Sequence, residues 1–203
     1  MAPGFLAVLA EPGNQVSLDE FHDWYDNEHI PLRMNHLPSF LSCARYQSID
    51  GIKPSWIAVY EIDDTKTFGD QSYTVLREKR SQREKDVMER LEVMDRRTCE
   101  VVREVDEGRG PRTTGLRMGN PSRWVVTHGV GRAAGEGVDD NTDSEKVARW
   151  LNEVVTKLEN NSVDGWVKTR VLKVLDSAKT GASGNSNGDL LSHLVFHGGV
   201  LFP

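Results

Sequence analysis

One apolar pattern near the N-terminus of this 203-residue chain returns 126 positions later without a gap. Four pairs of positions carry it: Phe21 with Val147, Trp24 with Trp150, Leu32 with Leu158, and Phe40 with Trp166. The reactive side chains of the first copy do not return, because Tyr25, Glu28, His29 and Arg33 correspond to Leu151, Val154, Val155 and Glu159. Internal repetition of this kind indicates a duplicated structural unit. We therefore expect two related halves, of which only the first carries chemistry.

The first half predicts the element order β-α-β-β-α-β, the split arrangement of ferredoxin-like domains. Short apolar or alternating runs predict four strands, at residues 4–10, 40–49, 55–62 and 97–105. A second helix is expected over residues 73–94, where apolar residues share a helical face on either side of a strongly charged run.

The first helix should begin at Leu18, because Ser17 and Glu20 have the spacing of a capping box. Pro31 lacks an amide hydrogen and clashes with the carbonyl group four residues before it. The regular helix is therefore expected to end or kink near His29, which places an imidazole in its last turn.

The second half predicts a strand, a helix and two strands, at residues 123–130, 144–159, 165–175 and 190–196. We assign residues 1–110 to the first repeat, 111–122 to a linker, and 123–203 to a shortened second repeat without the last helix and strand. The expected fold class is α+β. Two such sheets would bury their uncovered faces against each other as an α+β barrel, within one chain or between chains, and enclose a small-molecule cavity.

The composition excludes several classes of protein. The formal net charge of −6 gives no basic excess for binding nucleic acid. Cys43 and Cys99 have neither metal-ligand spacing nor a disulfide-rich context, so both are expected to be reduced thiols. No run reaches membrane-spanning length and no signal peptide is evident. We expect a cytoplasmic protein without a membrane or nucleic-acid partner.

The motif of Trp24, Tyr25, His29, Pro31 and Leu32 resembles the EthD-like domains of the dimeric α+β barrel superfamily. The following segments PSFLSCARY and PSWIAVYEID are similar to fungal two-repeat members of that group. The resemblance implies a ferredoxin-like module that pairs into a barrel, within the chain or as a homodimer. It also implies secondary metabolism, in which relatives include cofactor-independent decarboxylases, cyclases, isomerases and oxygenases acting on polyketide or aromatic compounds. Some relatives bind haem, and others have no demonstrated catalysis.

His29 is the expected general acid or base, since the ordinary pKa of histidine lies near neutrality. Tyr25 and Arg33 are the candidates for stabilising negative charge on a substrate. Four further residues are expected to contact the substrate: Trp24, Glu28, Trp56 and Tyr73. All seven candidates also have a structural interpretation. His29 could simply end a helix, the aromatic residues could belong to the core, and Glu28 and Arg33 could be surface charges.

The sequence therefore predicts a cofactor-free lyase or isomerase acting on a polyketide-like or aromatic small molecule. A barrel that binds a hydrophobic metabolite without chemistry is the alternative, and haem- or metal-dependent oxidation is a third possibility. His22, Asp26 and His29 have helical spacing that could present metal ligands, although we predict no metal site. The charged run at 76–86 is interpreted as a solvated helix, whose Arg77, Arg80 and Arg83 could instead face an anionic substrate.

Overall fold

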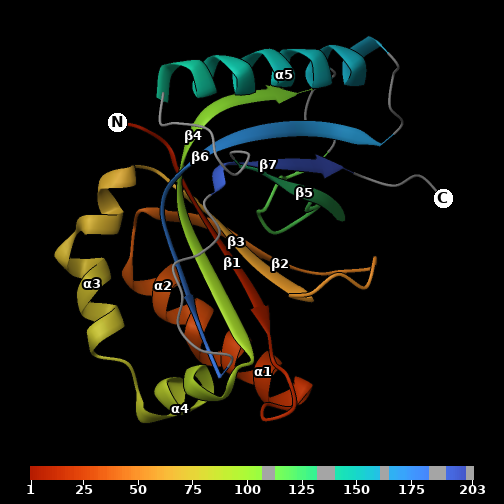
Figure 1. The fold of residues 1–203 in the computed structure, drawn as a ribbon. Helices are drawn as coiled ribbons and strands as arrows, with labels where there is room; N and C mark the ends of the chain where they lie inside the picture. Colours follow the sequence, from red (N-terminus) through yellow and green to blue (C-terminus); the bar gives the residue numbers. More distant parts are fainter. Residues whose placement is uncertain (107–112, 132–139, 161–164, 183–190, 200–203) are drawn as a thin grey trace. The chain divides into compact units, whose positions relative to one another are not determined.

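The structure is a computed structural model that describes residues 1–106, 113–131, 140–160, 165–182 and 191–199 (Figure 1). Its fold is mixed α+β, as predicted. The chain forms two compact units, the first made of residues 1–100 and 175–189 and the second of residues 101–174 and 190–203. Two long strands, β4 (Val93–Asp106) and β6 (Trp166–Thr180), therefore contribute to both units.

The first unit contains a sheet in which strands β2, β3, β1 and β4 are neighbours in that order. All three pairs are antiparallel, and Ala7 of the central strand lies opposite Val59 of β3 and Arg97 of β4. The strand bounds are β1 Gly4–Glu11, β2 Phe40–Gln47 and β3 Trp56–Ile62. This neighbour order and the β-α-β-β-α-β sequence of elements are those of the ferredoxin-like arrangement predicted for the first half.

The first helix begins as predicted, because the Ser17 hydroxyl accepts a hydrogen bond from the Glu20 amide at the start of α1 (Leu18–Trp24). The prediction that the regular helix ends or kinks near His29 is correct only in part, because the α-helix is interrupted there but the chain stays helical past Pro31. A π-helical turn, η1 (Tyr25–His29), leads directly into α2 (Ile30–His36), whose first turn contains Pro31. Within η1 the Ile30 amide bonds the Tyr25 carbonyl five residues back. The wider turn changes the spacing of the backbone hydrogen bonds next to Pro31, which has no amide hydrogen to donate.

The single helix expected over residues 73–94 is also a wrong prediction. The structure has a short 3₁₀ turn, η2 (Thr65–Gly69), then α3 (Gln71–Glu78) and α4 (Gln82–Arg90). Ser81 separates the two α-helices because its hydroxyl accepts from the Glu84 amide at 2.9 Å and so caps α4. Strand β4 follows at Val93, four residues earlier than the predicted start of the fourth strand.

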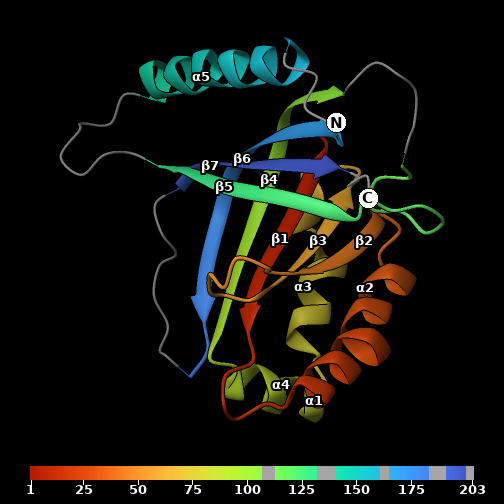
Figure 2. The same cartoon turned by 90° about the vertical axis from the view of Figure 1, so that its right-hand side faces the viewer.

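The helices of the first unit gather on one face of its strands, as Figure 2 shows. The core lies between these layers, where Leu6, Val8 and Tyr60 of the sheet pack with Phe21 and Trp24 of α1. Residues of the opposite strand face, such as Phe5, Ala7 and Cys99, are also at most 1% exposed.

The second unit contains β5 (Trp124–Gly131), α5 (Asp140–Asn160) and β7 (Leu191–Gly199), together with most of β6. Strand β7 pairs antiparallel with both β5 and β6, and Val147 of α5 packs on Val171 and Val195. Among the described residues, this repeats the neighbour relations of β1, β3 and β2. A common origin of the two units remains a prediction. None of the helices in the described ranges combines the length and apolar character needed to cross a membrane.

Candidate functional site

His29 is the centre of a buried polar cluster in the first unit. His29 is 4% exposed, and its Nδ1 atom lies 2.7 Å from Oε1 of Glu84 on α4. The centre of its ring lies 4.5 Å from that of Trp24 and 5.0 Å from that of Tyr25. The π-helical turn thus brings the motif residues of the first helix around one imidazole. Such turns occur frequently at functional sites.

Arg33 completes this cluster one turn further along the helix. Its Nη1 atom donates to the carbonyl oxygen of His29 at 2.7 Å, and its Nη2 atom lies 3.8 Å from Oε1 of Glu84. Glu84 is 1% exposed, and its charge is compensated by His29, Arg33 and the nearby Arg80. Arg33 fixes the backbone beside His29 as well as the carboxylate that His29 contacts.

The electrostatics of the pair favour a neutral imidazole beside an ionised carboxylate. Burial, reinforced by the charge of Arg33, lowers the pKa of His29 to about 3 despite the opposing effect of Glu84. Burial acts to raise the pKa of Glu84, but the His29 hydrogen bond and the nearby cations outweigh it and leave that pKa below its usual value. An ionised carboxylate only accepts hydrogen bonds, so His29 donates from Nδ1 and keeps a lone pair on Nε2.

Two polar atoms beside the imidazole lack hydrogen-bond partners within the part of the chain that the structure describes. These are the hydroxyl oxygen of Tyr25 and the indole nitrogen of Trp24, in residues that are 1% and 0% exposed. Burial raises the pKa of Tyr25, so its hydroxyl remains protonated and can donate. Buried donors without acceptors are uncommon and are candidates for contact with a ligand.

Arg45 closes the other side of Tyr25. Its guanidinium carbon lies 4.4 Å from the centre of the Tyr25 ring, within cation–π range, and its Nη1 atom donates to Asp26 at 2.7 Å. Its Nη2 atom is 2.8 Å from Nδ1 of His22. His22 and Asp26 therefore share Arg45 while His29 pairs with Glu84, so the structure separates the candidate metal ligands. Among the described residues no cluster of three or more histidine, cysteine, aspartate or glutamate side chains could hold a metal ion.

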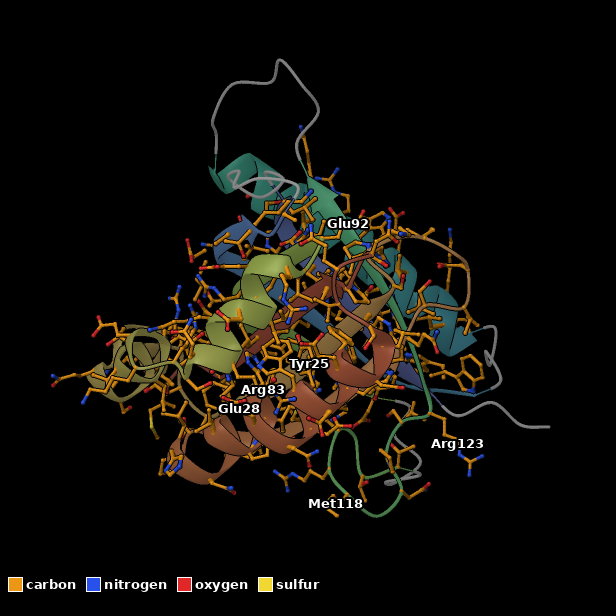
Figure 3. All side chains as sticks on the ribbon, turned by 90° about the horizontal axis from the view of Figure 1, so that it is seen from below. Tyr25, Glu28, Arg83, Glu92, Met118 and Arg123 are labelled. Atoms are coloured by element: carbon orange, nitrogen blue, oxygen red, sulfur yellow. The ribbon has the colours of Figure 1, made fainter. Side chains whose placement is uncertain are left out.

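The structure brings together four of the predicted site residues, Trp24, Tyr25, His29 and Arg33, and places the other three elsewhere. Glu28 bonds the Ser81 hydroxyl and lies 3.7 Å from Arg83 (Figure 3). Trp56 packs edge-on against the His22 ring at 4.6 Å. Tyr73 stacks on Phe40 in the core.

Glu84 was missed, because the charged run around it was interpreted as a solvated helix. That interpretation is wrong at this position, where the side chain is 1% exposed. Two sequence signals could have found it. Glu84 follows Ser81 at capping-box spacing, and it shares a helical face with Val87 and Leu91, which are both 0% exposed.

The histidines of the second unit have some polar and ring contacts within that unit. The Thr169 hydroxyl lies 2.7 Å from Nδ1 of His197, whose ring stacks on that of His128 at 5.3 Å between centres. Burial lowers the pKa of His197 to about 4.

Comparison with known proteins supports the fold of this chain but not a family. No protein-family model and no curated protein matches the chain. A solved structure described as an anthrone oxidase-like protein is similar, with a TM-score of 0.53, 9% sequence identity, and coverage of 98% of this chain and 73% of that chain. At that identity the likeness shows the shared α+β fold and no more. Membership of the EthD-like group remains a prediction.

Proposed function

We propose that the chain is a cofactor-independent lyase or isomerase acting on a polyketide-like or aromatic small molecule, with His29 as the general base and acid. The observation that carries the proposal is the contact of 2.7 Å between His29 Nδ1 and the buried Glu84 carboxylate. A carboxylate that holds one ring nitrogen leaves the other nitrogen oriented and unprotonated, so that its lone pair can accept a proton from a substrate.

In the proposed reaction, Nε2 of His29 removes a proton from a carbon next to a carbonyl group. The electron pair moves onto the carbonyl oxygen, where the unpartnered hydroxyl of Tyr25 donates a hydrogen bond to the developing enolate. Protonated His29 then returns the proton to another carbon, which completes an isomerisation. In the decarboxylation of a β-keto acid, His29 instead takes the carboxyl proton, the broken bond to the departing carbon dioxide supplies the electron pair of the enolate, and protonated His29 returns the proton to the carbon left behind. Arg33 holds His29 and Glu84 in place, which suits positioning better than direct contact with the substrate.

The similar structure supports this choice of substrate class. Its description names an anthrone oxidase-like protein, and anthrone is an aromatic ketone whose ring carbon carries acidic protons. The proposal for this chain takes from that structure only the class of substrate, and it includes no oxidation.

The test is deuterium uptake from heavy water by aromatic ketones, together with carbon dioxide release from aromatic β-keto acids. His29→Gln should lower the rate by about 100-fold or more, because general-base catalysis contributes at least that much. His36→Gln is the matched control, since His36 lies at the end of the same helical segment and is exposed. A folded His29→Gln protein that keeps a rate within a few-fold of the parent would show that His29 is not the general base.

Non-catalytic binding of a hydrophobic metabolite is the second candidate, and the 4% exposure of His29 favours it. A substrate must displace packed side chains to reach the imidazole. Saturable binding of the same ketones without exchange or carbon dioxide release would establish this alternative.

A further inference from the structure

A cavity of about 360 Å³ lies on the helical side of the first unit, apart from the His29 cluster. Helices α3 and α4 form one wall, and the adjoining segments of β4 and β6 form the other. His29, Tyr25 and Trp24 are not among its lining residues. Its volume is within the range of small-molecule sites.

The lining of the cavity is strongly cationic. Four basic side chains, Arg77, Arg80, Lys85 and Arg96, face one carboxylate, Glu89. Asp176 pairs with Arg96 at 2.6 Å but is 62% exposed and does not line the cavity. Cations that line one cavity repel one another, and an anion between them would reduce that repulsion.

Arg80 supplies a second, independent observation. Its Nε atom is buried and has no hydrogen-bond acceptor among the described residues. An unpaired buried donor is costly, and the residue to which it belongs lines the cavity. A carboxylate, sulfonate or phosphate oxygen beside Arg80 would give its guanidinium group a charge-assisted bond.

The cavity also has an apolar part. Met88 of α4 and Met94 of β4 line it beside Ala178 of β6. Methionine side chains adapt to flat or irregular apolar groups. A ligand that satisfies both parts carries an anionic group on a small apolar body.

We infer that this cavity is a binding site for a small amphipathic organic anion, separate from the proposed catalytic cluster. The anionic group is bound by Arg77, Arg80 and Lys85, and the apolar body lies against Met88 and Met94. The charge of Arg80 also acts on His29 and Glu84, but none of the His29 cluster lines the cavity. Binding of an anion can therefore be tested separately from the chemistry proposed at His29.

Isothermal titration calorimetry on the full chain tests the inference with 2-naphthoate as the probe. The neutral 2-naphthalenemethanol and inorganic phosphate serve as matched ligands that lack the charge or the ring. We expect saturable binding of 2-naphthoate at about 1 mM or below, and binding at least about tenfold weaker for each matched ligand. Added salt should weaken the binding of 2-naphthoate.

The test variant is Arg77→Gln combined with Lys85→Gln, since both side chains are exposed and their loss leaves the core intact. It should bind 2-naphthoate about tenfold or more weakly. The control, Lys66→Gln combined with Lys79→Gln, removes the same charge from exposed positions outside the cavity and should bind like the parent. Undetectable binding by the parent, equal binding of naphthalenemethanol, equal binding of phosphate alone, or unchanged binding by the test variant would each overturn the inference.

Discussion

The Nδ1 atom of His29 and the Oε1 atom of Glu84 lie 2.7 Å apart although 55 positions separate the two residues in the chain. Helix α4 is therefore part of the candidate site, together with the helical segment that carries His29. The contact couples the protonation of the imidazole to a carboxylate that is buried with it.

Removal of this carboxylate should be costly for stability as well as for activity. Glu84→Ala leaves Arg33 and His29 without their shared buried partner, and loss of one member of a buried pair costs about 3–5 kcal/mol. Glu78→Ala, at an exposed position of the neighbouring helix α3 and outside the cavity, should change the free energy of unfolding by about 0.5 kcal/mol or less. Urea unfolding of the two variants measures the difference, and equal losses would show that the buried pair has no special role.

Local signals were sufficient to predict most of the first unit. The Ser17 hydroxyl caps the helix at Leu18 as its spacing predicted, and the alternating run that ends at Ile62 forms β3. Capping and alternation depend on neighbours within a few residues, so they can be inferred without a structure. The motif residues around His29 could be grouped for the same reason.

The partner of His29 could not be predicted in this way. Whether a charged residue such as Glu84 is solvated or buried depends on which helix face packs, and that face is fixed by tertiary contacts of Val87 and Leu91. The π-helical turn also escaped prediction, because the rule for proline assumes a regular helix around Pro31.

Stability should fall as the pH is lowered from about 6.5 toward 5. Burial lowers the pKa of four histidines, His29, His128, His193 and His197. Below their ordinary value of about 6.5 the unfolded chain takes up protons that the folded chain does not, so folding is favoured above that pH and is progressively disfavoured below it. Above pH 5 carboxylates with lowered pKa values remain ionised, so the slope in this window reports the histidines.

Replacement of one of these histidines tests the effect. His197→Asn keeps a polar side chain that can bond the Thr169 hydroxyl and removes one titrating group. The slope of unfolding free energy against pH, measured in urea between pH 5 and 6.5, should decrease by up to about 1.4 kcal/mol per pH unit. A parent protein whose stability is flat over this window would contradict the expectation.

Arg45 should contribute to the site through its stacking on aromatic rings. Its guanidinium carbon lies 4.4 Å from the Tyr25 ring centre and 5.5 Å from that of Trp56. Arg45→Gln should lower the free energy of unfolding by about 1–2 kcal/mol, since the side chain is only 12% exposed. Arg123→Gln, at an exposed position shown in Figure 3, is the control and should have little effect. Indistinguishable urea midpoints for the two variants would rule out the stacking contribution.

Pro31→Ala distinguishes two accounts of the π-helical turn. If η1 lets the helix pass Pro31 without strain, the proline stabilises the fold by restricting the unfolded chain, and alanine should lower the free energy of unfolding by about 0.4–1 kcal/mol. A proline that disrupts a regular helix costs about 3 kcal/mol, so alanine would then raise that free energy by a similar amount. Pro38→Ala, beyond the end of α2, calibrates the unfolded-state effect where no helix is interrupted. Urea unfolding should give losses of similar size for both variants, whereas a gain for Pro31→Ala alone would show that the turn is strained.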